Sequence, residues 1–367
     1  MKKFLALLLV LVTALPIAAA AEDDIHKKSE YILSLGEAIN LAMTDNPQFI
    51  TYDTKIEDSK VQLQQAKYDV LNSKGPIPLP AGFNIVLLRK NYYVNQAQNT
   101  LTGAHMEKTQ AEKKLEYDVT EKYYNVKMAE ELLKTSQTAY ELMQTNYNTV
   151  KTQLELGMAA ELDERNANLA LMQAKSTLDG YERSLETARD ALRIALQIEN
   201  EDAFITLTDT ISCDDFTADL KKDILSAQET RYDLFQLKNN YNQSLVYLEA
   251  ASTLGEKSTQ FSSANLAVRQ CDYYYTNSKR QISLLVKNAY NSVLSAKDNL
   301  DIATESRDLK NREYSVANLK YGLGLITNTE LTNTLNALAS ADIALENAKL
   351  AYKLAAIKYG YEITIGL

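Results

Sequence analysis

The sequence predicts an all-α fold dominated by long antiparallel coiled-coil helices, duplicated within one chain and accompanied by a few short strands. Three observations lead to this prediction: the position of the prolines, a seven-residue repeat of apolar side chains, and an internal duplication. All five prolines lie at or before Pro80. Because proline breaks the interior of a helix, the stretch from Ala81 to Leu367 permits very long helices.

Apolar side chains recur every seven residues in four stretches of the sequence. Such a stripe faces a partner helix, and its period imposes a left-handed supercoil. The stripes consist of Ala42, Phe49, Ile56, Leu63 and Val70; of Val119, Val126, Leu133, Tyr140, Tyr147 and Leu154; of Leu171, Leu178, Leu185 and Leu192; and of Leu331, Leu338, Leu345, Tyr352 and Tyr359. Alanines at many of the partner positions indicate closely spaced helices rather than a thick globular core.

The pattern of the first half returns in the second half. Ala42 opens a stripe that restarts at Ala227, 185 positions later. Gly157, after Leu-Glu-Leu, corresponds to Gly322, after Leu-Lys-Tyr, 165 positions later, whereas the leucine stripe beyond it is displaced by 167. We therefore expect the second glycine turn to be two residues longer than the first.

The first 21 residues have the order of a secretory signal peptide. Lys2 and Lys3 precede an apolar run, which the small residues Ala18 to Ala21 follow. An uncleaved membrane anchor is the alternative, although the run is short for a spanning helix. The prediction is an exported protein whose chain continues from residue 22.

Beyond the signal peptide the chain divides into two helical repeats, residues 22–202 and 203–367. Each is expected to run from a shorter helix through an interruption into a long helix, a glycine turn and a returning helix. The first long helix, from about Thr102 to Leu156, would span roughly 80 Å at a rise of 1.5 Å per residue. Alternating apolar residues near 204–208 and 363–367 predict two short strands that pair at mid-length.

The ordered motifs resemble those of the TolC-like outer-membrane efflux proteins over nearly all of the chain after the signal peptide. The resemblance rests on Leu35-x-x-Ala38-x-x-x-Ala42-x-x-x-Asn46-Pro47, on its counterpart Ala227-x-x-x-Arg231-Tyr232-Asp233-Leu234, and on the turn from Tyr321 to Leu331. It implies a homotrimer whose helices form a hollow α-barrel, fed by an inner-membrane pump through a periplasmic adaptor. It also implies that the turns at Gly157, Gly322 and Gly324 face the adaptor.

One departure from the family concerns the interruptions between the short and long helices, where the family inserts β-hairpins that close into a membrane barrel. A membrane-spanning strand needs about 9–11 residues of alternating polarity. The segment from Lys74 to Asn91 barely accommodates two such strands, and the segment from Ser252 to Asn265 cannot. We therefore expect the barrel to be missing or reduced. The family resemblance still implies location in the cell envelope, at the outer membrane.

Nothing in the sequence predicts an enzyme, a cofactor or a metal site. The two histidines, His26 and His105, lack Cys, Asp or Glu at ligand spacing and are expected on the surface. The net charge of −9 argues against a nucleic-acid partner. A structural or adhesive coiled-coil protein of the envelope is the alternative to an efflux duct, and an exported hydrolase has no candidate nucleophile–base pair.

Acidic residues next to the glycine turns have two interpretations. Asp163, Glu164 and Glu330 would form carboxylate rings that favour cations at a narrow trimeric entrance. Alternatively, like Glu161, they are N-terminal helix acids that interact with the helix dipole. Cys213 and Cys271 are predicted not to pair within one protomer, because the intervening helix carries them apart by several tens of Å.

Overall fold

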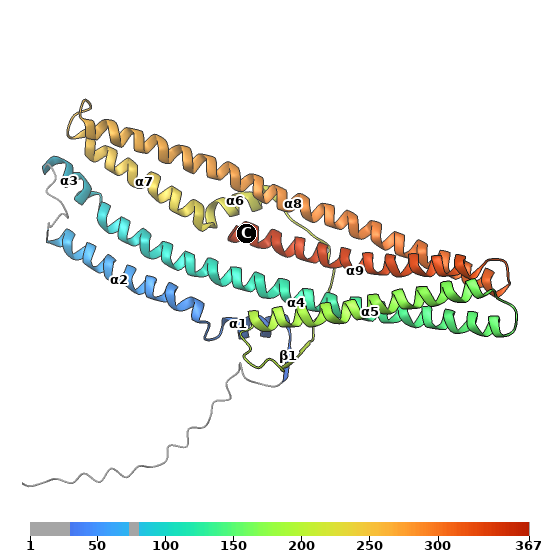
Figure 1. The fold of residues 1–367 in the computed structure, drawn as a ribbon. Helices are drawn as coiled ribbons and strands as arrows, with labels where there is room; N and C mark the ends of the chain where they lie inside the picture. Colours follow the sequence, from blue (N-terminus) through green and yellow to red (C-terminus); the bar gives the residue numbers. More distant parts are fainter. Residues whose placement is uncertain (1–29, 73–80, 367) are drawn as a thin grey trace, which may run out of the picture.

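The computed structural model describes residues 30–72 and 81–366, which form an elongated array of helices (Figure 1). The predicted signal peptide and His26 lie outside the described residues. The first repeat contains β1 (Glu30–Leu33), α1 (Leu35–Met43), the 3-10 turn Pro47–Phe49, α2 (Ile50–Leu71), α3 (Ala81–Arg89), α4 (Tyr92–Glu155) and α5 (Glu161–Ala195). The second contains β2 (Phe204–Leu207), α6 (Leu220–Thr230), α7 (Tyr232–Ser252), α8 (Thr259–Gly322) and α9 (Asn328–Thr364).

The two long helices confirm the predicted duplication. Helices α4 and α8 each have 64 residues, which corresponds to about 96 Å at 1.5 Å per residue. Helix α4 begins at Tyr92, ten residues earlier than the sequence indicated, since the glycine and the amides near its start are tolerated in a partly exposed helix. Both ends of α8 lie 167 positions after those of α4, so the two connections that follow have equal length. The expectation of a longer second turn is wrong.

The shorter helices cover the two halves of each long helix. In the first repeat, α1 and α2 pack on the beginning of α4 and α5 packs on its end; in the second, α6 and α7 pack on the beginning of α8 and α9 on its end. The repeats meet where α4 contacts α9 and α7. The α4–α5 and α8–α9 connections lie together at one end of the molecule, here named the tip end, and α3 lies at the other, the far end (Figure 1).

The predicted seams form the core of each repeat. Val119, Val126 and Leu192 are fully buried in the first repeat, as are Val286 and Val293 in the second, and buried tyrosines complete the packing. Tyrosine hydroxyls find polar partners within the seams. In a coiled coil of this kind most of the stability comes from burial of the apolar stripe rather than from intrinsic helix propensity.

Strand β2 was predicted, but its partner was not. It pairs in parallel with β1, with Glu30 opposite Phe204, and the inward residues of both strands are buried at mid-length. The strand predicted at 363–367 is wrong over its described residues. Ile363 lies in α9 and packs into the second-repeat core, because the heptad stripe through Tyr359 carries the helix on to Thr364.

The interruptions contain helix and turn among their described residues, and no strand. Helix α3 buries Phe83 and Leu87 against Ala250 and Ala251 of α7. In the second repeat the chain turns through Gly255, whose φ is +90°, directly into α8. Across residues 30–72 and 81–366, every helix is too short or too polar to cross a membrane.

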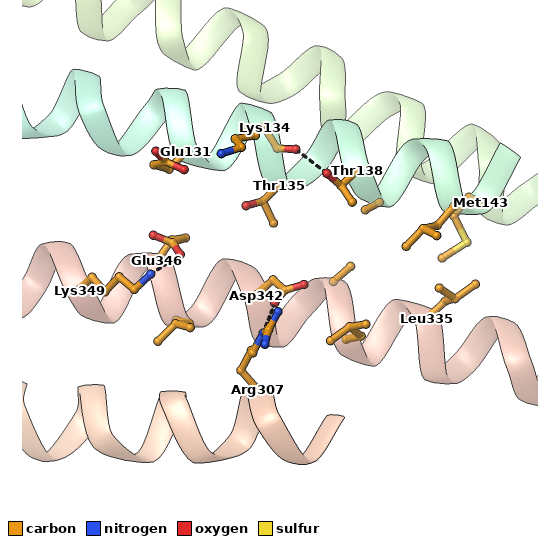
Figure 2. A pocket seen from close by; sticks show the side chains of 15 residues that line it. Glu131, Lys134, Thr135, Thr138, Met143, Arg307, Leu335, Asp342, Glu346 and Lys349 are labelled. Carbon is orange, nitrogen blue, oxygen red and sulfur yellow. Dashed lines mark hydrogen bonds and ion pairs between the residues drawn. The ribbon is translucent and has the colours of Figure 1, made fainter. Parts of the chain in front are cut away.

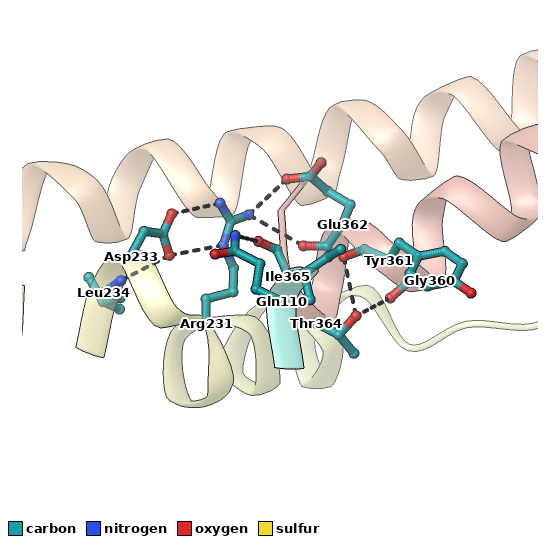
Figure 3. A network of polar contacts seen from close by, with 9 residues as sticks. All are labelled: Gln110, Arg231, Asp233, Leu234, Gly360, Tyr361, Glu362, Thr364 and Ile365. Atoms are coloured by element: carbon teal, nitrogen blue, oxygen red, sulfur yellow. Dashed lines mark hydrogen bonds and ion pairs between the residues drawn. The ribbon is translucent and has the colours of Figure 1, made fainter. Parts of the chain in front are cut away.

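A buried polar network joins the C-terminal end of α9 to the junction of α6 and α7 (Figure 3). The Arg231 guanidinium donates to the Glu362 carboxylate at 2.8 Å and to the Asp233 carboxylate at 2.7 Å. Gln110 of α4 donates to the Ile365 carbonyl at 3.0 Å, which ties the first repeat to the same place. A β-carbon on Gly366, whose φ is +69°, would lie 2.1 Å from the Arg231 Nη2 atom. Only glycine fits there, so the network fixes where α9 ends.

Candidate functional site

The first connection at the tip end closes around a left-handed glycine. Helix α4 ends at Glu155, and Gly157 adopts a φ of +72°. The Gly157 N–H donates to the Leu154 carbonyl at 2.9 Å, and the Met158 N–H donates to the Gln153 carbonyl at 2.7 Å. These paired bonds form a Schellman motif, which satisfies carbonyls that the end of a helix leaves free.

The second connection repeats this geometry 167 positions later. Gly324 has a φ of +71°, its N–H donates to the Tyr321 carbonyl at 2.9 Å, and the Leu325 N–H donates to the Lys320 carbonyl at 2.9 Å. Gly322 is the last residue of α8, and its φ is not in the left-handed region. The prediction that Gly322 supplies a left-handed conformation is therefore wrong, and Gly324 is the counterpart of Gly157.

Alanine substitutions separate the two glycines. Gly324→Ala is expected to destabilise the α8–α9 turn by about 1 kcal/mol, because a β-carbon is disfavoured in the left-handed region. Gly322→Ala is the matched control: it adds a β-carbon to a helical residue with open space around it, and is expected to leave stability unchanged or to raise it slightly. Thermal unfolding of both variants checks this. Equal losses of stability in the two variants would contradict the assignment.

The acids after the turns stabilise the starts of the returning helices. Glu330 accepts from the Thr327 N–H at 2.8 Å and from the Thr327 hydroxyl at 3.1 Å. These bonds hold the pKa of Glu330 below its ordinary value. Asp163 accepts from the Ala160 N–H at 3.2 Å, and a hydrogen bond to Glu164 raises the pKa of Tyr147. The capping interpretation is confirmed for Asp163 and Glu330, while the carboxylate ring stays a prediction.

Large apolar side chains are exposed at matching positions of both turns. Leu156 and Met158 flank Gly157, and Leu323 and Leu325 flank Gly324 in the same places. These four residues, here named the tip quartet, are 68–74% exposed. Leu162 and Leu319 extend the exposed apolar surface along the adjoining helices. An apolar surface at the end of a helical hairpin is typical of a site that another protein covers.

Polar contacts hold the two hairpins together just behind the turns. The Tyr321 hydroxyl donates to the Gln153 Oε1 atom at 2.7 Å, and burial raises the pKa of this tyrosine. One turn further back, the buried Asn146 Nδ2 atom donates to the Thr332 hydroxyl at 3.0 Å. The tip quartet is therefore presented by one joined pair of hairpins.

Behind these contacts a groove of about 450 Å³ separates α4 from α9 (Figure 2). Lys134 and Glu131 project into it from α4, and Lys349 and Glu346 project into it from α9. Arg307 of α8 reaches Asp342 at 2.8 Å on its edge. The charges of both signs balance, so the groove does not define a binding site for an ion of one sign.

Other candidate chemistry is sparse in the described part of the chain. His105 is exposed, as predicted. Cys213 and Cys271 are both free. Among residues 30–72 and 81–366, no group of three or more His, Cys, Asp and Glu side chains is arranged to hold a metal ion. Sequence reasoning had missed the tip quartet, although an apolar residue on each side of both turn glycines was a signal for it.

No protein-family model and no curated protein sequence matches the chain. Solved structures match over about nine-tenths of it. The MtrE outer membrane channel of Neisseria gonorrhoeae has 15% identity and a TM-score of 0.70, with 91% of this chain and 89% of that chain covered. The CmeC outer membrane channel of Campylobacter jejuni has 14% identity and a TM-score of 0.68, with 90% and 85% covered.

The outer membrane protein VceC of Vibrio cholerae matches at 12% identity and a TM-score of 0.69, with 91% of this chain and 97% of that chain covered. The fold of this chain is therefore that of the TolC-like outer-membrane channels, as the resemblance in the sequence implied. The shared fold places the tip hairpins, the far end and the mid-length strands in one common architecture.

Proposed function

We propose that the chain is the exit duct of an envelope efflux or type I secretion system: a passive trimeric tunnel that joins a periplasmic adaptor and an inner-membrane pump. The observation that carries the proposal is the pair of matching hairpin turns at one end of a channel fold, each with two exposed apolar side chains. The cell envelope, at the outer membrane, is the location that accords with this function.

The tip quartet is the proposed contact with the adaptor. Three copies would present six equivalent turns around the entrance, each with a leucine before its glycine and a leucine or methionine after it. Burial of such side chains stabilises a complex by about 1.5–3 kcal/mol each. The left-handed glycines keep the turns short, so that the apolar pairs form the outermost surface.

The acids behind the turns would set the charge of the entrance. The lowered pKa of Glu330 keeps its carboxylate ionised at neutral pH. Asp163 and Glu164 occupy the start of the equivalent helix in the first repeat. In a closed trimer these carboxylates are proposed to form rings that favour cations and disfavour anions.

Site-specific photo-crosslinking tests the proposed contact. A photoreactive residue is introduced at Met158 in cells that also express a periplasmic adaptor and its pump, and Leu71, which is 84% exposed near the far end, serves as the control. We expect adaptor crosslinks from position 158 and none from position 71. A structural envelope coiled coil without a transport role would give no adaptor crosslink from either position, and that result would reject the duct.

A further inference from the structure

Helix α8 has an apolar stripe on its outer face that meets no other element of the chain. Ile302, Leu309 and Val316 are spaced by seven residues and are 50–67% exposed. The helices that pack on α8 are α6, α7 and α9. At the opposite edge of the molecule, α5 and α2 likewise have one outer face without a partner in the chain. The two edges of the helical array are therefore both incomplete.

The duplication shows what the stripe on α8 is built to contact. The residues of α4 that lie 167 positions before Ile302 and Leu309 are Thr135 and Leu142. Both line the groove between α4 and α9, where the first repeat packs on the second. The outer face of α8 thus corresponds to the face of α4 that meets the next repeat along the chain.

The outer face of α5 corresponds in the same way to the opposing wall of that groove. Met172 of α5 lies 167 positions before Ala339 of α9, which lines the groove opposite Leu142. Met172 is 62% exposed. If a second copy supplied the missing repeat, Leu309 of α8 and Met172 of α5 would take the places of Leu142 and Ala339.

The polar contact inside the chain also has a counterpart at the two edges. The buried Asn146–Thr332 hydrogen bond joins α4 to α9. The residues 167 positions from these two are Glu313 on α8 and Arg165 on α5, both exposed and opposite in charge. An uncharged pair within the chain is thus replaced by an ion pair between edges.

The charges of the whole helices agree with this pairing. Helix α8 contains nine Lys and Arg against six Asp and Glu, a net charge of +3. Helix α5 contains five against seven, a net charge of −2, and α2 contains three against four, a net charge of −1. An α8–α8 contact would bring two positive helices together, whereas contact of α8 with α5 and α2 joins opposite charges.

The far half follows the same rule. Within the chain, Gly103 of α4 packs near Phe235 of α7, and Glu107 lies 3.5 Å from the Tyr232 hydroxyl. Tyr274 of α8 stands 167 positions after Glu107, and Ile50 of α2 stands 185 positions before Phe235; both are exposed. The unpartnered surface of α8 therefore continues from the tip half to the far half.

We propose that copies of this chain join head to tail by repeating the internal interface between the repeats, so that α8 of one copy packs on α5 and α2 of the next, with Glu313 facing Arg165. A contact between two different edges closes into a ring when its rotation allows. The number of copies, three, rests on the proposed duct function, whereas the pairing of edges rests on the duplication.

Crosslinking between engineered cysteines tests the pairing. In a background with Cys213→Ser and Cys271→Ser, the double variant Leu309→Cys, Met172→Cys is treated with a short bis-maleimide. We expect covalent dimers and trimers from the double variant and monomers from each single variant. Efficient dimers from Leu309→Cys alone would mean that α8 packs on α8, and would overturn the proposal.

Charge reversal gives an independent readout. Arg165→Glu and Glu313→Arg are each expected to lower the fraction of assembled protein at least tenfold at low salt, and the double variant is expected to restore it. Absence of both crosslinks and rescue in protein that light scattering shows to be trimeric would reject this pairing and leave the duct intact. A folded monomer at micromolar concentration would instead reject the trimeric duct itself.

Discussion

Replacement of Arg231 by methionine is expected to lower the free energy of unfolding by about 3–5 kcal/mol, the usual cost of removing one partner of a buried ion pair. The Arg231 side chain is 6% exposed and that of Glu362 is 5% exposed, so the carboxylate loses its ion-pair partner in a place that water does not reach. The same substitution removes the guanidinium against which Gly366 packs.

Chemical denaturation at matched protein concentration measures this effect. Lys60→Met is the control, because Lys60 pairs with Glu57 on the surface of α2 and such exposed pairs contribute less than about 1 kcal/mol. We expect the loss of Arg231 to release the end of α9 first, so that hydrogen exchange rises around Tyr361. A loss of stability no larger than that of the control would show that the network does not hold the C-terminal end.

Replacement of the tip quartet by aspartate is expected to weaken adaptor binding at least about 100-fold, since four exposed apolar contacts per copy are lost and each contributes roughly 1.5–3 kcal/mol when buried. The stability of the isolated protein is expected to change little, because Leu156, Met158, Leu323 and Leu325 are at least 68% exposed. The measurement is the dissociation constant for a purified adaptor, together with the helical content.

A control variant with the same change of charge locates the effect. Leu71→Asp with Leu225→Asp alters two exposed leucines away from the turns, and its affinity for the adaptor is expected to equal that of the unchanged protein. Unchanged binding by the tip variant would remove the turns from the adaptor contact. Equal weakening by the control would point to a general effect of added negative charge.

The helical seams were predictable because a seven-residue stripe is visible along one helix without knowledge of its partners. Val119 and Val126 illustrate this: both were predicted on a seam and both are fully buried. The strand Glu30–Leu33 was not predictable in the same way. Its four residues contain too little alternation to stand out, and the strand forms only because β2 lies beside it.

The turns show a second limit of reading one sequence. Gly322 and Gly324 lie in one short segment, and the sequence favoured Gly322 as the match of Gly157 because similar residues precede both. Hydrogen bonding decides otherwise, since α8 keeps its helical bonds to Gly322 and the Schellman pair forms around Gly324. The ends of helices depend on such local bonds, which the stripe pattern does not contain.

Helix α3 was missed for a related reason. The apolar run around Phe83 does not alternate and is too short to show a helical period, so it was assigned only as an interruption. Its place comes from tertiary contact, because Phe83 packs edge-on against Tyr247 of α7 with ring centroids 5.1 Å apart. Contacts between segments distant in the sequence therefore supply what the local pattern lacks.

Electron cryomicroscopy of the purified, exported protein tests the central claim most directly. The account predicts end-on views of a closed ring of three copies around a continuous lumen, and side views in which the paired turns of all copies lie at one end. A solid helical bundle without a lumen, or an open filament of copies, would contradict it.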